Sequence, residues 1–238
     1  MSAVPSGYVI AGMVEAQEAP IPRHSLRLSG TVHAPRWRGL LHFWALVLAV
    51  PAALALTLHD PVAPTAVYAV ALVVMYATST AYHRLPLSAG RRHLLRQADH
   101  AMIYLFTAAS YTPFCLLAVR GTLGIVVLIL AWLGAIAGVA IKVVGFRSMP
   151  IIGSVLYLVL GFLAVVTLPD AARVLTGAEI GLILATGLVY LTGVLVLFTR
   201  RPDPIPHLFG YHEIWHGCVV LASSFYFLVV WEMAALGR

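Results

Sequence analysis

Charged side chains are scarce in this sequence, since Asp, Glu, Lys and Arg together make up only 10% of its 238 residues. Hydrophobic residues make up 61%, and the mean hydropathy is +0.93. Soluble domains carry about 25% charged residues, so this composition excludes a soluble globule. We expect an all-α membrane protein, because helices satisfy their own backbone hydrogen bonds without water.

Long polar segments and paired cysteines are also missing. Only residues 1–39 mix Pro, Ser, Gly and charge in the way that is typical of a disordered tail. The two cysteines, Cys115 and Cys218, are expected at depths on the order of 15 Å apart, beyond the reach of a disulfide. The sequence therefore predicts a disordered tail over residues 1–39 and a transmembrane domain over residues 40–238.

Seven apolar stretches follow the tail, and each is close to the roughly 20 residues that span about 30 Å of hydrocarbon as a helix. They predict a seven-transmembrane helix bundle. Gly134-x3-Gly138 predicts a close helix contact within it, and Pro51 and Pro113 predict kinks. The stretches are Leu40–Leu58, Thr65–His83, Asp99–Val119, Leu123–Val143, Ile151–Leu168, Glu179–Phe198 and Tyr211–Met233.

The basic residues are distributed unevenly over the connections. Twelve of the fifteen fall in the tail and in the second, fourth and sixth connections, and the others are Arg120, Arg173 and Arg238. Short cytoplasmic loops carry excess Lys and Arg, so we expect a cytoplasmic N-terminus, an outer C-terminus and a plasma-membrane location. The net charge of +6 favours contact with anionic lipid headgroups. Because the basic connections lack interleaved aromatic residues, we expect no nucleic-acid partner.

Five polar side chains stand at the ends of the apolar stretches: Ser79, His83, Asp99, His212 and His216. Each histidine-containing pair is spaced i, i+4, so its two side chains lie on one helix face. With seven spans, the end of the second and the starts of the third and seventh face the same side, which here is the cytoplasm. All five are therefore expected near the inner leaflet, where embedded ionisable groups mark functional sites.

Three imidazoles beside one carboxylate suit zinc better than a harder metal. Catalytic zinc sites use three protein ligands and leave the fourth position to water, which makes His83, His212 and His216 the predicted ligands. Asp99 is predicted to act as a general base or to orient a ligand imidazole. Ser79 is predicted to donate to the oxygen that gains negative charge when a carbonyl is attacked.

Each of these residues also has a structural interpretation that the sequence leaves open. The Ser79 hydroxyl can bond back to the carbonyl of Met75 within its own helix. Asp99 can cap a helix that begins just after it. His83 and His212 can reach headgroups at the interface.

Three more polar residues are expected near the same depth. Whether His42 or His100 joins the site stays open. Glu213 points about 100° away from His212 on a helix, so we expect a headgroup or neighbouring-helix contact rather than ligation. We do not interpret the string HEIWH, residues 212–216, as the HExxH motif of zinc proteases.

Three motifs carry a resemblance to a known family: STAYHR around Ser79 and His83, Asp99 followed by Tyr104-x-Phe106, and HEIWH. Together they resemble the hemolysin III branch of the progestin and adipoQ receptor (PAQR) family, whose wider superfamily includes alkaline ceramidases. The resemblance covers residues 40–233. It implies zinc held by the three histidines, with the Asp and Ser beside it, and a metal-dependent hydrolase of lipid amides. Receptor members carry an Asn in the second-span motif that is missing here, so receptor signalling is not carried over.

We therefore expect a zinc enzyme that hydrolyses an amide or ester bond of a lipid reaching the site from the inner leaflet. The alternative is a non-enzymatic, cytolysin-like or membrane-homeostasis protein in which zinc joins three spans and Asp99 is the fourth ligand. A transporter is the third hypothesis, and it is disfavoured because the polar groups stop at the inner leaflet. The sequence leaves the oligomeric state open.

Overall fold

The computed structural model describes residues 37–144 and 150–235, and within these ranges the chain forms helices and no β-strand. The predicted disordered tail therefore lies almost wholly outside the described residues. Helix α4 continues directly into the π-helix η2. The elements are α2 (Leu40–His59), α3 (Ala63–Arg84), α4 (Ala89–Pro113), η2 (Phe114–Val119), α5 (Gly121–Val143), α6 (Pro150–Ala171), α7 (Gly177–Thr199) and α8 (Tyr211–Ala235).

Each predicted apolar stretch corresponds to one of these helices, when α4 and η2 are taken together. Six of them are long and apolar enough to cross a membrane: α2, α3, α4 with η2, α5, α7 and α8. The apolar part described for α6, Val155–Ala171, is shorter. The all-helical architecture is confirmed, and the seven-span topology stays a prediction.

Helix α4 begins at Ala89, ten residues before the start predicted for the third span. It follows Ser88, whose extended backbone (ψ 157°) ends the preceding connection. Its first turns are polar and exposed, so hydropathy alone does not reveal them, although their Ala, Arg, Leu and Gln residues favour a helix. Asp99 therefore lies inside the helix, and the interpretation that it caps a helix is wrong.

The glycines of α5 lie at close helix contacts, as the sequence predicted, whereas the kinks at Pro51 and Pro113 stay predictions. The chain changes from α-helix to π-helix just after Pro113, because proline lacks the N–H of the regular ladder. A Cβ at Gly134 would lie 2.7 Å from Leu160 Cδ2 of α6, and one at Gly138 would overlap the ring of Tyr104 of α4. The predicted close contacts within the bundle are confirmed. The two cysteines are free thiols, as expected from their separation.

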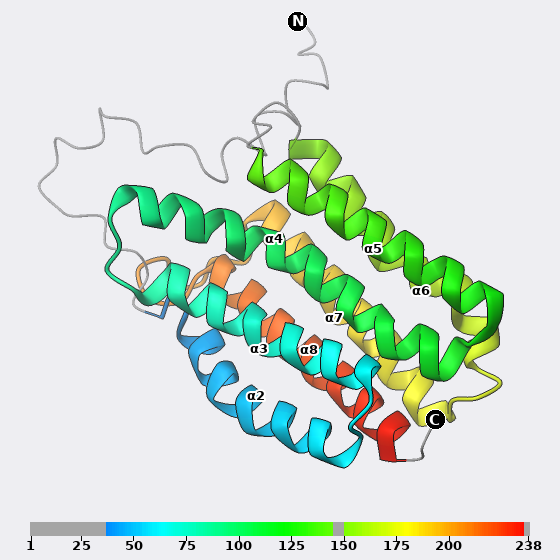
Figure 1. The fold of residues 1–238 in the computed structure, drawn as a ribbon. Coiled ribbons are helices and arrows are strands. Elements are labelled where there is room, and N and C mark those ends of the chain that lie inside the picture. Colours follow the sequence, from blue (N-terminus) through cyan, green and yellow to red (C-terminus); the bar gives the residue numbers. More distant parts are fainter. Residues whose placement is uncertain (1–36, 145–149, 236–238) are drawn as a thin grey trace, which may run out of the picture.

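Helices that follow one another in the sequence lie side by side from α2 to α6, and α7 packs on α8. Helix α8 also packs on α2, so the first and last described helices meet (Figure 1). As a result, the start of α2, the end of α3 and the start of α8 share one end of the bundle (Figure 1).

Buried tyrosine and serine side chains fix how the central helices face one another. The Tyr76 hydroxyl of α3 is hydrogen-bonded to Ser223 Oγ of α8 at 2.5 Å. The Tyr226 hydroxyl of α8 donates to the Ser110 carbonyl of α4 at 2.7 Å. Because the interior of a membrane bundle offers little water, polar groups there pair with one another. These bonds hold α3, α4 and α8 in the register that the site needs.

Candidate metal centre

The three histidines predicted as metal ligands converge at the end of the bundle where α2 and α8 begin and α3 ends. His83 comes from α3, His212 and His216 come from α8, and one nitrogen of each lies within 4.8 Å of the others. The ring centroid of His83 lies 5.2 Å from that of His212 and 5.1 Å from that of His216. The centroids of the two α8 rings are 4.6 Å apart. Nitrogens at this separation are close enough that the three residues could hold one metal ion.

The start of α8 is held in place by hydrogen bonds from its own connection. The backbone N–H of Tyr211 donates to Asp203 Oδ1 at 3.0 Å, and that of Gly210 donates to Glu213 Oε2 at 2.9 Å. A helix leaves such N–H groups unpaired in its first turn, so these carboxylates set where α8 begins. His212 consequently lies in the first turn, and His216 lies one turn deeper on the same face.

The start of α2 approaches His83 closely because the residue before the helix is glycine. Gly39 has a φ of 73°, which glycine adopts without strain. A Cβ at this position would lie only 2.6 Å from the Cβ of His83. The close approach brings the first turns of α2, including His42, against the histidine cluster.

Asp99 reaches the cluster from α4. Its Oδ2 atom lies 3.8 Å from Nε2 of His83, and the two side chains are 15% and 7% exposed, respectively. This distance is too long for a direct hydrogen bond but suits a carboxylate that meets the imidazole through a shared ligand or water. The structure thus brings the predicted carboxylate beside the predicted ligands.

Ser79 lies one turn before His83 on α3, and its hydroxyl is hydrogen-bonded to His42 Nδ1 at 2.8 Å. Among the hydrogen bonds of the described residues, Ser79 makes none to the carbonyl of Met75, so that structural interpretation is wrong. The question that the sequence left open is answered for His42, which lies at the site. For His100 the question stays open.

Within the part of the chain that the structure describes, two buried imidazole nitrogens of the cluster have no hydrogen-bond partner: Nε2 of His83 and Nε2 of His212. Burying one unpaired polar group costs about 1–3 kcal/mol, so two such nitrogens side by side call for an explanation. A cation that accepts both lone pairs provides one, and imidazoles near a carboxylate suit borderline metals. The residues present therefore fit a bound metal ion. This also disfavours the interfacial interpretation of the two histidines, since their buried nitrogens do not reach headgroups.

Glu213 is turned away from the cluster. Its Oε1 accepts a hydrogen bond from Arg38 Nε at 3.1 Å, its Oε2 accepts the Gly210 bond, and the residue is 1% exposed. Of the two contacts expected for Glu213, the structure shows no headgroup contact but an ion pair with Arg38, in the segment directly before the neighbouring helix α2. The string HEIWH has the residues of HExxH at the same spacing, so the interpretation that it does not match this motif was wrong. However, the glutamate that serves as general base in that motif is here bonded to Arg38.

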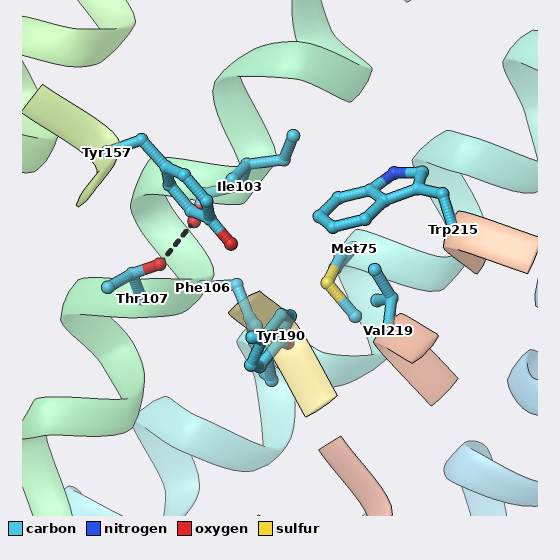
Figure 2. A pocket seen from close by; sticks show the side chains of 8 residues that line it. All are labelled: Met75, Ile103, Phe106, Thr107, Tyr157, Tyr190, Trp215 and Val219. Carbon is cyan, nitrogen blue, oxygen red and sulfur yellow. Dashed lines mark hydrogen bonds between the residues drawn. The ribbon is translucent and has the colours of Figure 1, made fainter. Parts of the chain in front are cut away.

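A small cavity lies one helical turn deeper than the polar cluster. Tyr157 and Thr107 lie on one side of it, and Trp215 lies on the other (Figure 2). Its volume of about 20 Å³ accommodates about one water molecule. Several of its lining residues follow or precede site residues by one turn on α3, α4 and α8, namely Met75, Ile103 and Val219.

Comparison with known families gives a match over most of the chain. A family model described as Haemolysin-III related matches residues 30–227. This range contains α2 to α7, most of α8 and all five predicted site residues.

Characterised proteins from bacteria and mammals are similar over most of their length. Hemolysin-3 of Bacillus cereus is 31% identical over 199 residues, which are 80% of this chain and 87% of that protein. The Hemolysin-3 homolog of Bacillus subtilis is 29% identical over 164 residues, 69% of this chain and 74% of that protein. The monocyte to macrophage differentiation factor of Homo sapiens is 27% identical over 172 residues, 70% of this chain and 68% of that protein.

Proposed function

This chain belongs to the haemolysin-III related family of multi-pass integral membrane proteins, and from that premise we propose that it is a zinc-dependent hydrolase of lipid amides or esters. One observation carries the proposal. Three buried or half-buried histidines converge beside a carboxylate, and two of their Nε2 atoms have no hydrogen-bond partner among the described residues.

His83, His212 and His216 would hold the zinc ion. Three imidazoles are a known ligand set of catalytic zinc, in which the fourth position is left to water or substrate. When bound, zinc polarises a carbonyl oxygen and lowers the pKa of water towards 7, which makes hydroxide available at neutral pH.

Asp99 and Ser79 would handle the proton and the developing charge. Asp99 lies 3.8 Å from His83 Nε2, and this distance supports a carboxylate that would accept a proton from an attacking water beside the histidines. Ser79 lies one turn from His83, and its hydroxyl would donate to the oxygen that becomes negative as a carbonyl is attacked. The two residues come from α3 and α4, so tertiary packing sets their separation.

The surroundings of the site favour a lipid as the substrate. The cluster stands at the end of a bundle whose outer surface is apolar, and the cavity one turn deeper is lined mainly by apolar side chains. At about 20 Å³ the cavity admits no acyl chain as it stands. We expect an entering acyl chain to widen the cavity by displacing flexible side chains such as Met75. The uneven distribution of basic residues supports a site that faces the cytoplasm.

Asp99 also favours a second candidate function. Structural zinc sites have four protein ligands, and this carboxylate is near enough to the histidines to be the fourth. In that case the ion would join α3, α4 and α8 in a non-enzymatic protein, such as a cytolysin-like or membrane-homeostasis factor.

Turnover by purified, zinc-loaded protein separates the two candidates. A panel of lipid amides and esters in mixed micelles would be followed by release of free fatty acid. We expect wild type to cleave at least one class and Asp99→Asn to keep its zinc while losing about 10²–10⁴-fold in rate. If fully loaded wild type cleaves none of them and Asp99→Asn loses zinc, the enzyme is refuted and the structural ion is favoured.

A further inference from the structure

His42 of α2 is a fourth histidine at the metal centre, and its contacts differ in kind from those of the other three. We propose that His42 is a positioning residue, which holds Ser79 by a hydrogen bond and His216 by ring stacking. The inference rests on the proposed metal function and names the residue that keeps two parts of the site in register.

The hydrogen bond is the first observation. His42 Nδ1 lies 2.8 Å from Ser79 Oγ, and the two residues are 4% and 3% exposed, respectively. A serine hydroxyl rotates freely unless a partner fixes it. When His42 donates its Nδ1–H to the Ser79 oxygen, the hydroxyl hydrogen stays available for another acceptor, and in a buried site without competing water this bond limits where the hydroxyl points. Ser79 is also hydrogen-bonded to the side chain of Asp99, so His42 and Asp99 together orient the hydroxyl.

The ring stack is the second observation. The rings of His42 and His216 are 4.0 Å apart at an interplanar angle of 7°, while the edge of Tyr76 packs on His42 at 5.2 Å and 66°. The Tyr76 hydroxyl is itself hydrogen-bonded to Ser223, and this bond fixes the tyrosine ring that packs against His42. Replacing a residue that orients a ligand imidazole commonly weakens metal affinity about 10–100-fold.

The same stack argues that His42 is not itself a ligand. An imidazole nitrogen directs its lone pair in the plane of the ring, so an ion bound by His216 lies in the plane of His216. Because the two rings are stacked with centroids 4.0 Å apart and nearly parallel, their in-plane lone pairs do not converge on one point, so an ion held by His216 would not be held by His42 as well. The group of nitrogens within 4.8 Å of one another accordingly consists of His83, His212 and His216.

Two substitutions separate the hydrogen bond from the stack. His42→Phe keeps an aromatic ring against His216 but cannot bond Ser79. His42→Asn has an amide that can bond the Ser79 hydroxyl in either direction but has no ring to stack. Zn²⁺ affinity would be measured by competition with a chelator, and the visible absorption of the Co²⁺-loaded protein would report ligand geometry.

We expect His42→Asn to weaken Zn²⁺ binding about tenfold and to shift the Co²⁺ bands, because His216 loses its support. We expect His42→Phe to bind Zn²⁺ within about threefold of wild type with an unchanged Co²⁺ spectrum. Adding Ser79→Ala to His42→Phe should then lower turnover by less than Ser79→Ala does in the wild type, since the hydroxyl has already lost one of its two partners.

The matched control is His59, which lies at the other end of the same helix and stacks on Trp231 of α8 at 5.1 Å and 13°. His59→Asn should leave Zn²⁺ affinity and the Co²⁺ spectrum unchanged. Wild-type values in both His42 variants would overturn the inference, and so would a loss of metal as complete as that of His216→Ala, which would make His42 a ligand. If wild type itself binds neither ion, the proposed metal function fails first.

Discussion

The two ends of the helix bundle treat buried polar groups in opposite ways. Where α3 and α7 begin, these groups pair within their own segment: Thr176 and Glu179 form a capping box, and the Thr65 hydroxyl donates to the Asp60 carbonyl at 2.8 Å. At the metal-centre end, polar side chains from α2, α3, α4 and α8 meet, and several of their nitrogens have no hydrogen-bond partner in the described ranges 37–144 and 150–235. Local pairing serves folding, whereas convergence with unpaired nitrogens indicates a binding site.

The largest expected effect comes from removing a ligand at the metal-centre end. His212→Ala and His216→Ala should each weaken Zn²⁺ binding by more than about 100-fold, because loss of a direct ligand exceeds the effect of a supporting residue. Chelator competition measures the change. Comparable affinity in wild type and in both variants would place the ion elsewhere.

Loss of the Ser79 hydroxyl should slow the reaction while the metal stays bound. Ser79→Ala removes the predicted donor to the developing oxyanion, which typically costs about 10²–10³ in kcat. The measurement is turnover of the best lipid substrate at matched zinc content. Ser110→Ala is the control, because the Ser110 hydroxyl donates back to Phe106 O within α4 at 2.8 Å. Equal rates in the two variants would contradict the role assigned to Ser79.

Most of the helices followed from hydropathy alone, because six of them are long and apolar enough to stand out from their connections, and the described apolar part of α6 is shorter. The first turns of α4 did not, since residues 89–98 are polar and only their helix propensity indicates a helix. The convergence of Ser79, His83 and the α8 histidines followed from the parity of the spans. Hydropathy therefore predicts where helices cross, and it is silent about where they extend beyond the apolar core.

Contacts between distant segments could not be predicted. Glu213 pairs with Arg38, which is 175 positions away, and nothing in either local sequence names the other. His42 stood alone in its apolar stretch, so its bond to Ser79 and its stack on His216 depend on α2 packing against both α3 and α8. The sequence around a single polar residue in a span does not identify the residue that it contacts, and this contact becomes visible only in the tertiary structure.

The ion pair between Arg38 and Glu213, next to the metal centre, should contribute to folding stability and not to turnover. Arg38→Ala leaves the Glu213 carboxylate, which is 1% exposed, without its cation, and we expect a loss of about 2 kcal/mol in unfolding free energy. Thermal unfolding in detergent measures it. The control is Arg173→Ala, whose pair with Asp170 is exposed and should contribute less than about 1 kcal/mol. Glu213→Gln should keep turnover within a few-fold, whereas a loss of several orders of magnitude would restore it as an HExxH base.

The smallest effect is expected at the opposite end of the bundle. Thr176→Ala removes the hydroxyl that accepts from the backbone N–H of Glu179, and helix caps of this kind contribute about 1 kcal/mol. The unfolding temperature in detergent should fall slightly, with Zn²⁺ affinity unchanged. A change in metal affinity would break the contrast between the two ends.

Metal content tests the central claim most directly. Protein purified without chelator and analysed for its elements should contain about one zinc per chain, and His83→Ala, His212→Ala and His216→Ala should each contain far less, since every catalytic zinc site of this kind needs three protein ligands. His59→Ala, at the far end of α2, should match wild type. Zinc-free wild type, or full zinc in all three histidine variants, would contradict the account.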